Sequence, residues 1–151
     1  MEKFAFILHP LSLQDMEHLS PWMRYIPDPI IEACLKMKKP FKVSHITGIK
    51  SPYAEAEGWF IGCPLTAKQM VELPEEFVMD RIIESGKVAQ ELGAKIVGLG
   101  AFTSIVGDAG ITVAKNLDIA VTSGNSYTVA TAIQGTKQAA RMMGKDLKEC
   151  R

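Results

Sequence analysis

Apolar residues in this sequence gather in short unbroken runs that alternate with longer amphipathic stretches. The first run is residues 4–8 (FAFIL), which ends at His9-Pro10 and is typical of a strand buried on both faces of a parallel sheet. Two later runs of the same kind are residues 95–97 (KIV) and 119–121 (IAV). Each of these later runs leads directly into a turn of small polar residues.

Residues 41–49 (FKVSHITGI) differ, because apolar and polar positions alternate along them. Together with residues 58–62 (GWFIG) they predict a hairpin or a sheet edge. The strand–helix–strand pattern across residues 58–97 is too long for a hairpin and indicates a crossover between parallel strands. We therefore predict a layered α/β fold, with a largely parallel sheet flanked by helices and an antiparallel edge hairpin.

Helix signals lie between the apolar runs. Ser12 is followed three positions later by Asp15, which predicts a capping box at a helix start. Residues 66–92 have helical periodicity that is interrupted at Pro74. The last helix, predicted over residues 126–143, carries an amphipathic stripe along its whole length.

The bulk properties of the chain exclude several classes of partner. A length of 151 residues with 47% hydrophobic composition predicts one domain over residues 1–151. Seventeen basic residues balance 17 acidic ones, so no net field favours nucleic acid or an anionic membrane. No run approaches the ~18 apolar residues of a membrane helix, and the N-terminal run is too short for a signal peptide core. We expect a cytoplasmic protein without an integral membrane segment or nucleic-acid partner.

The cysteines predict neither disulfides nor a metal site. Cys34, Cys63 and Cys150 are odd in number and widely spaced, which favours a reducing compartment. Nothing near Cys63 in the sequence would lower the pKa of its thiol, so a buried filler is favoured over a nucleophile. No cluster of His, Cys, Asp and Glu has metal-ligand spacing, and we predict no metal.

Two turns carry the polar groups that could hold a ligand. They are residues 98–104 (GLGAFTS) and residues 122–126 (TSGNS), the second leading into the last helix. The free N–H groups of a helix's first turn attract a carboxylate, phosphate or carbonyl oxygen. The predicted substrate-binding residues are Thr103, Ser104, Thr122, Ser123, Gly124, Asn125 and Ser126. The alternative is that Ser123 or Asn125 only caps the helix and that the glycines only form tight turns.

The first turn contains G-x-G but is not a dinucleotide fingerprint, because the third glycine would fall at Thr103. His9 and His45 each sit at or near the end of a predicted strand, where acid/base residues often lie. His9 is the candidate catalytic acid/base. For both histidines a hydrogen-bonded structural role stays open as the alternative.

Four segments resemble a known family. They are FAFILHPLSL (residues 4–13), GLGAFTSI (98–105), TSGNSYT (122–128) and AARMMGKDL (139–147). These segments are similar to the N-terminal region of the bacterial predicted amino-acid dehydrogenases, which share their pattern with the cyanobacterial long-chain acyl carrier protein reductases. The resemblance implies a substrate-side domain of the shikimate-dehydrogenase type, packed against a nucleotide-binding domain that holds NAD or NADP, with the active site between them.

In that family a Rossmann strand follows the AARMMGKDL helix, whereas this chain stops at Cys150-Arg151. The helix over residues 126–143 would then connect to a Rossmann domain absent from this chain. None of the three cysteines matches the acyl-accepting cysteine of the reductases. We expect a fragment or a standalone copy of the domain, inactive on its own.

Two functional hypotheses follow. In the first, the chain is the substrate-binding, cleft-forming domain of an NAD(P)-dependent oxidoreductase that acts on a carbonyl, amino-acid or acyl-thioester compound. In the second, it is a non-catalytic module that docks a carrier protein or partner enzyme through an apolar patch. Trp22, Met23, Tyr25 and Ile26 would form that patch, unless they belong to the core. Both hypotheses leave open whether the chain forms a homo-oligomer.

Overall fold

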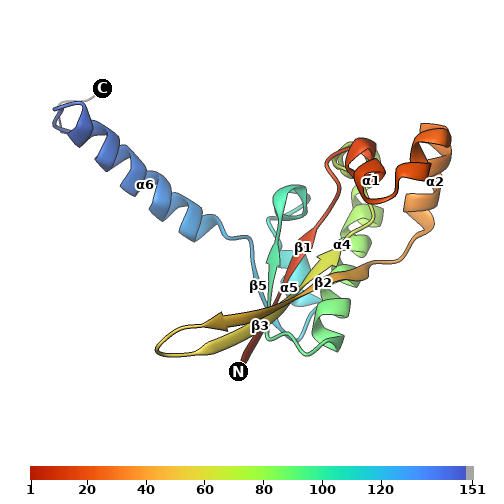
Figure 1. Cartoon of the computed structure of the whole chain (residues 1–151), viewed down its shortest axis with the longest axis horizontal. Helices are drawn as coiled ribbons and strands as arrows, with labels where there is room; N and C mark the ends of the chain where they lie inside the picture. Colours follow the sequence, from red (N-terminus) through yellow and green to blue (C-terminus); the bar gives the residue numbers. More distant parts are fainter. Residues whose placement is uncertain (149–151) are drawn as a thin grey trace.

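A computed structural model describes residues 1–148, with the side chains of residues 17–19 outside the description (Figure 1). Within this part of the chain the strands form one five-stranded sheet in the order β2-β3-β1-β4-β5. The strands are β1 (Glu2–Leu8), β2 (Phe41–Lys50), β3 (Glu55–Gly62), β4 (Ile96–Leu99) and β5 (Ala120–Thr122). All neighbouring pairs are parallel except β2 and β3, which form an antiparallel hairpin at the sheet edge. The predicted α/β class and edge hairpin are confirmed.

The predicted helices after Ser12, over residues 66–92 with a break at Pro74, and near residues 126–143 are present, together with two further helices. They are α1 (Leu13–Leu19), α2 (Asp28–Met37), α3 (Ala67–Glu72), α4 (Glu75–Glu91), α5 (Ile111–Lys115) and α6 (Asn125–Met142), with 3₁₀ turns η1 (Pro21–Tyr25) and η2 (Ala101–Ser104). Asp15 accepts the backbone N–H of Ser12 at 2.9 Å, which is the predicted capping box of α1. Pro74 separates α3 from α4, as expected of a residue without a backbone donor.

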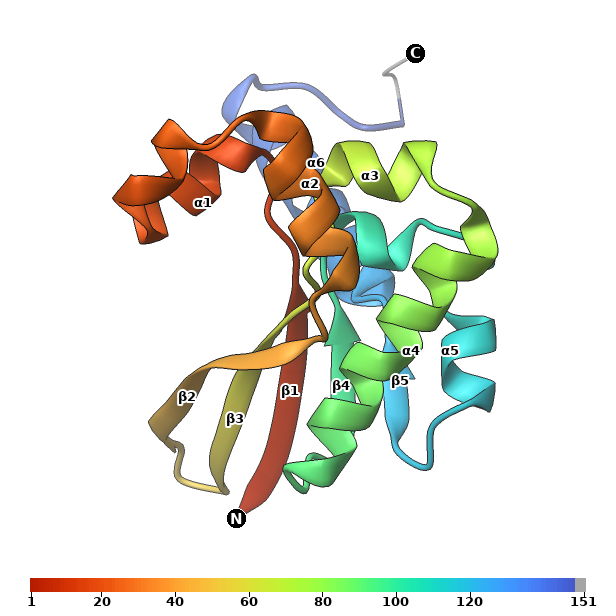
Figure 2. The ribbon, with the colours of Figure 1, turned by 90° about the vertical axis from the view of Figure 1, so that its right-hand side faces the viewer.

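The hydrophobic core lies between α4 and one face of the sheet. The buried residues of the central strands on this face are Ala5 and Ile7 of β1, Trp59 and Ile61 of β3, and Val97 and Leu99 of β4. The facing side of α4 contributes Val78, Ile82 and Ala89. Figure 2 shows α4 in front of the sheet and α6 on its far side. A helix layer therefore packs against only one face of the sheet.

The opposite face of the sheet is uncovered in the described structure, and we call it the open face. It consists of Phe4, Phe6, Leu8, Phe60 and Ile96. Phe6 and Leu8 are each 37% exposed, so the prediction that residues 4–8 form a strand buried on both faces is wrong. The reason is that α4 covers one face while α6 does not return to cover the other.

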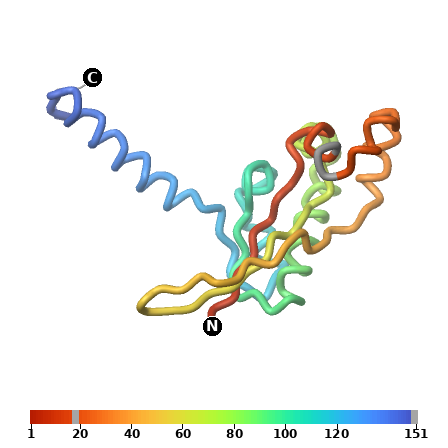
Figure 3. The backbone as a smooth tube through the Cα atoms, in the orientation of Figure 1, coloured from red at the N-terminus to blue at the C-terminus, as the bar shows by residue number. Residues whose placement is uncertain are grey.

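Helix α6 projects away from the body of the molecule (Figures 1 and 3). Of its 18 residues only Ala140 is buried. It begins one residue earlier than predicted, at Asn125, and ends before Gly144, whose φ is +65°. Within residues 1–148 no helix combines the length and apolar character needed to cross a bilayer.

Candidate functional site

The carboxyl ends of the four parallel strands, β1, β3, β4 and β5, lie at one edge of the sheet. His9 follows β1, Gly100 follows β4 and Ser123 follows β5. The chain leaving β1 leads toward β3, whereas the chain leaving β4 leads toward β5, so the two connections diverge. Such a divergence between neighbouring strands is a topological switch point, the usual ligand position in open α/β sheets.

His9 joins the two strands at this point. Its Nε2 accepts the backbone N–H of Phe102 at 3.2 Å, and its Nδ1 lies 3.0 Å from the Pro10 carbonyl oxygen. The ring also packs edge-on against Phe102, with centroids 5.9 Å apart. Because a carbonyl only accepts and a backbone N–H only donates, these bonds require the neutral tautomer with its proton on Nδ1.

Both ring nitrogens of His9 are therefore used by the backbone. In this arrangement the imidazole holds the β1 end against the η2 turn, and proton transfer to a substrate would require one of the two bonds to open. An acid/base role for His9 stays a prediction, and its positioning role is what the contacts support.

A pocket of about 200 Å³ lies beside His9, between the strand ends and helices α1 and α2. Its walls are mainly apolar: Leu8, Met16, Leu35, Phe41, Val43 and Pro64. Two exposed charged residues, Asp15 and Lys38, also contribute to the lining. The ammonium of Lys38 lies 4.0 Å from the centroid of the Phe41 ring, a cation–π contact that holds this charge beside the pocket.

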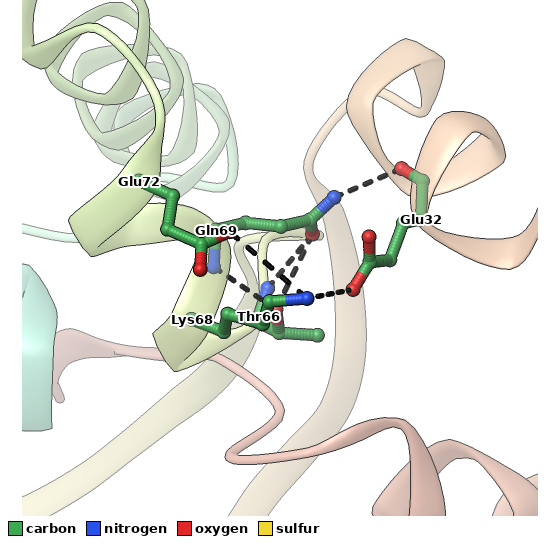
Figure 4. Close-up of polar contacts among 5 residues, drawn as sticks. All are labelled: Glu32, Thr66, Lys68, Gln69 and Glu72. Carbon is green, nitrogen blue, oxygen red and sulfur yellow. Dashed lines mark hydrogen bonds and ion pairs between the residues drawn. The ribbon is translucent and has the colours of Figure 1, made fainter. Parts of the chain in front are cut away.

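The wall formed by α2 is anchored to α3 through buried and exposed contacts (Figure 4). Gln69 is buried, and its Nε2 donates to the backbone carbonyl of Glu32 at 2.9 Å while its Oε1 accepts the N–H of Thr66 at 3.1 Å. On the surface the Lys68 ammonium pairs with the Glu32 carboxylate at 3.2 Å, and this contact raises the pKa of Lys68. Arg81 adds a bond to the Lys36 carbonyl at 2.9 Å, so both halves of α2 are fixed.

Cys63 contributes to the lining of the same pocket, but its thiol is unreactive. The residue is fully buried, and burial raises the pKa of its thiol to about 11, against a smaller opposing effect of the Ser85 hydroxyl. The thiol is thus protonated at neutral pH and is a poor nucleophile. This confirms the filler interpretation of Cys63; Cys34 is exposed, and Cys150 lies outside the described residues.

The hydroxyls of the η2 turn are used internally. Thr103 is only 1% exposed and donates to the Gly100 carbonyl at 2.7 Å. Ser104 donates to the Ala101 carbonyl at 2.7 Å. Direct contact between Thr103 and a substrate would require the turn to open, whereas Ser104 is half-buried at the same edge. Their substrate-binding roles stay predictions.

Helix α6 begins at a different N-cap residue from the two that the sequence suggested. The N-cap is Gly124, with φ +73° and no side-chain cap hydrogen bond, so the interpretation of Ser123 or Asn125 as the cap is wrong. The Thr122 hydroxyl accepts the Gly124 N–H at 3.2 Å. Ser123 is half-buried, while Asn125 and Ser126 are exposed on the first turn of α6. These side chains are available to a ligand, although they do not line the pocket beside His9.

The structure thus brings the predicted residues to one edge of the sheet but divides them. His9 lies at the pocket with the η2 turn beside it, while residues 122–126 lie across β4 at the far strand. Sequence reasoning missed Leu35, Phe41 and Val43, which form the apolar wall. The alternating pattern of residues 41–49 placed the last two on a strand, but nothing local showed that their strand faces α2.

His45 has the contacts of a structural residue. Its ring stacks on Trp59 with centroids 5.4 Å apart, and its Nε2 lies 3.3 Å from the Glu57 carboxylate. Lys3 pairs with the same carboxylate at 3.4 Å. These contacts stabilise the hairpin edge on the α4 side of the sheet.

No protein-family model matches the chain. A stretch of 97 residues, 64% of this chain, is 35% identical to the aminotransferase PigE of Serratia sp. (strain ATCC 39006). The matched stretch amounts to 11% of that much longer protein. The match therefore concerns a small part of PigE.

Proposed function

We propose that this chain is the substrate-binding, cleft-forming domain of an NAD(P)-dependent oxidoreductase that acts on a carbonyl, amino-acid or acyl-thioester substrate. The observation that carries the proposal is the apolar pocket beside His9, at the carboxyl ends of β1 and β3 and next to the topological switch point. The resemblance of residues 4–13, 98–105, 122–128 and 139–147 to the dehydrogenase and acyl carrier protein reductase family supports it.

The shape and polarity of the pocket fit one part of such a substrate. At about 200 Å³ it is smaller than the ~300–1,000 Å³ of pockets that enclose drug-sized ligands. It therefore takes a short apolar group, and the remainder of the ligand extends outside. The Lys38 ammonium is placed to pair with a carboxylate or another anionic group of the substrate. The exposed N-terminus of α6, with Asn125 and Ser126, would bind a second oxygen-bearing group.

The described residues do not themselves fit a dinucleotide. A Cβ added at Gly100 would lie 2.5 Å from the Ile7 carbonyl oxygen, and one at Gly98 would lie 2.6 Å from the Phe6 ring. Packing within the sheet thus accounts for the G-x-G pair without a pyrophosphate. NAD or NADP would be held by a neighbouring domain, which the family resemblance implies, and α6 would connect to it.

The similarity to PigE supports the substrate class only. That protein is named an aminotransferase, and aminotransferases act on amino and carbonyl compounds, the chemistry shared by two of the three proposed substrates. Because the match covers 11% of PigE, the name does not extend to an aminotransferase activity for this chain.

An exposed aromatic patch supports a second candidate function, docking of a carrier protein or partner enzyme. Trp22 and Tyr25 on η1 are 63% and 74% exposed, so the core interpretation of these two residues is wrong. Met23 and Ile26 are half-buried beside them. This function is compatible with the first, because a carrier-bound acyl thioester would need such a docking surface near the pocket.

Binding to the isolated chain tests the proposal without turnover. We expect short-chain acyl thioesters to shift the NMR signals of Leu35, Phe41 and Val43, and Val43→Arg to weaken this binding at least ~10-fold by filling the pocket mouth. Ile49→Arg is the matched control, since Ile49 is a similarly exposed residue of the same strand outside the pocket. If neither acyl thioesters nor amino or keto acids perturb these signals, the proposed substrate site is refuted.

A further inference from the structure

Two apolar surfaces of this chain are uncovered in the described structure. One is the open face of the sheet. The other is a stripe along α6, formed by Val129, Ile133, Thr136 and Met143, in which Ala140 is the one buried residue. Val129, Ile133 and Thr136 line a shallow groove together with Leu147. Ile133, in the middle of the stripe, is 50% exposed.

The open face is shaped to receive a helix. A Cβ added at Gly58 would lie 2.7 Å from the Phe4 ring, and one at Gly98 would lie 2.6 Å from the Phe6 ring. The two rings therefore lie over glycines of the neighbouring strands rather than pointing outward. The result is an apolar sheet face, and such a face is stabilised by packing against another element.

The dimensions and charges of α6 match this surface. The stripe from Val129 to Met143 is about 21 Å long at 1.5 Å per residue, and the seven residues of β1 extend about 23 Å. Residues 125–151 hold five basic and two acidic residues, whereas residues 1–124 hold twelve basic and fifteen acidic. The helix segment and the body of the molecule thus carry opposite net charge and attract each other.

We propose that two copies of this chain form a dimer in which α6 of each copy packs its stripe on the open face of the other. In the structure α6 extends away from its own sheet, so its stripe is presented to a second molecule rather than to the sheet it follows (Figure 1). Reciprocal exchange of an identical element gives a closed two-fold dimer at low cost.

The area buried requires both helices to dock. The stripe is about 21 Å long and about 10 Å wide and covers about 210 Å², so two helices bury about 840 Å² when both contacting surfaces are counted. That total lies in the range of weak, reversible interfaces, below about 1,200 Å², and one docked helix would provide only half of it. The symmetric dimer is therefore the arrangement that the two surfaces can stabilise. The proposal does not depend on the proposed function.

Sedimentation velocity on the 151-residue chain tests the proposal. We expect a dimer at micromolar concentration, and a monomer for Ile133→Asp, because the charge would be buried against Phe4 and Phe6. Gln138→Asp is the control: it introduces the same charge on the opposite side of α6 and should leave the dimer intact. A wild-type monomer at all concentrations, or a dimer that persists in Ile133→Asp, would overturn the proposal.

Cross-linking identifies the contact itself. In a background with Cys34→Ser and Cys150→Ser, an affinity-tagged Ile96→Cys protein is mixed with an untagged Ile133→Cys protein and treated with a bismaleimide. The buried, protonated Cys63 should not react. We expect a covalent product with one tagged and one untagged chain. If an Ile96→Cys/Ile133→Cys double variant is linked only within single chains, α6 covers its own sheet and the exchange is refuted.

Discussion

The Nε2 atom of His9 accepts the backbone N–H of Phe102 at 3.2 Å, across the junction where the connections of β1 and β4 diverge. This bond spans 93 positions in the sequence and lies beside the pocket. The bond places the histidine at the centre of the candidate site. It also gives the histidine a structural role that does not require catalysis. The two roles can be separated by choosing the replacement.

His9→Ala should lower the free energy of unfolding by about 1–3 kcal/mol, because the Phe102 N–H loses its acceptor in a half-buried position. His9→Gln offers an amide oxygen to the same N–H and should recover part of that loss. Urea denaturation of both variants measures the difference. Full stability in His9→Ala would show that the bond does not hold the strand ends together. In a full-length enzyme, a turnover loss in His9→Gln that exceeds its stability loss would support the acid/base role.

Gln69→Ala should destabilise the fold by about 1–3 kcal/mol, because it removes one bond to Glu32 on α2 and one to Thr66, both at a buried side chain. Lys68→Ala on the same helix removes the exposed ion pair with Glu32 and should have a much smaller effect. The two variants form a matched pair in chemical denaturation. A larger loss for Lys68→Ala would mean that the ion pair, and not the buried amide, fixes α2 over the pocket.

In the folded chain the thiol of Cys34 should be alkylated fast and the thiol of Cys63 slowly. Burial raises the pKa of Cys63 to about 11, so almost none of it is thiolate at pH 8, whereas Cys34 is exposed. Iodoacetamide followed by peptide mass spectrometry should find Cys34 modified and Cys63 protected, with protection lost in urea. Because the folded pKa is raised, the stabilisation by neutral Cys63 is complete below the unfolded pKa near 9 and disappears as the pH rises toward 11. Cys63→Ala should flatten that part of the stability curve.

Local signals were sufficient for most of the fold. Pro74 ended a helix because it lacks a backbone donor, and Ser12 with Asp15 began one, regardless of the remaining chain. The burial of β1 could not be predicted from local signals. An unbroken apolar run shows that both faces of the strand are apolar but not whether each face is covered, and in this chain α6 does not cover the second face. Packing between distant elements decides whether a face is covered.

The candidate site could be predicted only in part, because packing between distant elements determines it as well. A strand followed by His9-Pro10 placed the histidine at a sheet edge, and small polar residues placed the turns. The burial of Thr103 was not visible, since a threonine in a G-x-G-x-x-T turn can point inward or outward. The pocket wall comes from Leu35 on α2 and Phe41 and Val43 on β2, and tertiary contacts such as those of Gln69 and Arg81 hold α2 over the strand ends.

Gly124, the N-cap residue of α6, and Gly135 in the interior of α6 should respond in opposite directions to replacement by alanine. Gly124 has φ +73°, where an alanine is strained by roughly 1–2 kcal/mol, so Gly124→Ala should weaken the start of the helix. Gly135 lies in the helix interior with open space around its Cβ position, and Gly135→Ala should strengthen the helix by about 0.5–1 kcal/mol. Far-UV circular dichroism and the backbone chemical shifts of residues 125–129 report both effects. Because nothing lies within 4 Å of a Cβ at either position, packing differences do not confound the comparison. Equal helix content in the two variants would show that α6 does not begin from a left-handed Gly124, and the exposed N–H groups proposed to bind substrate would then lose their structural basis.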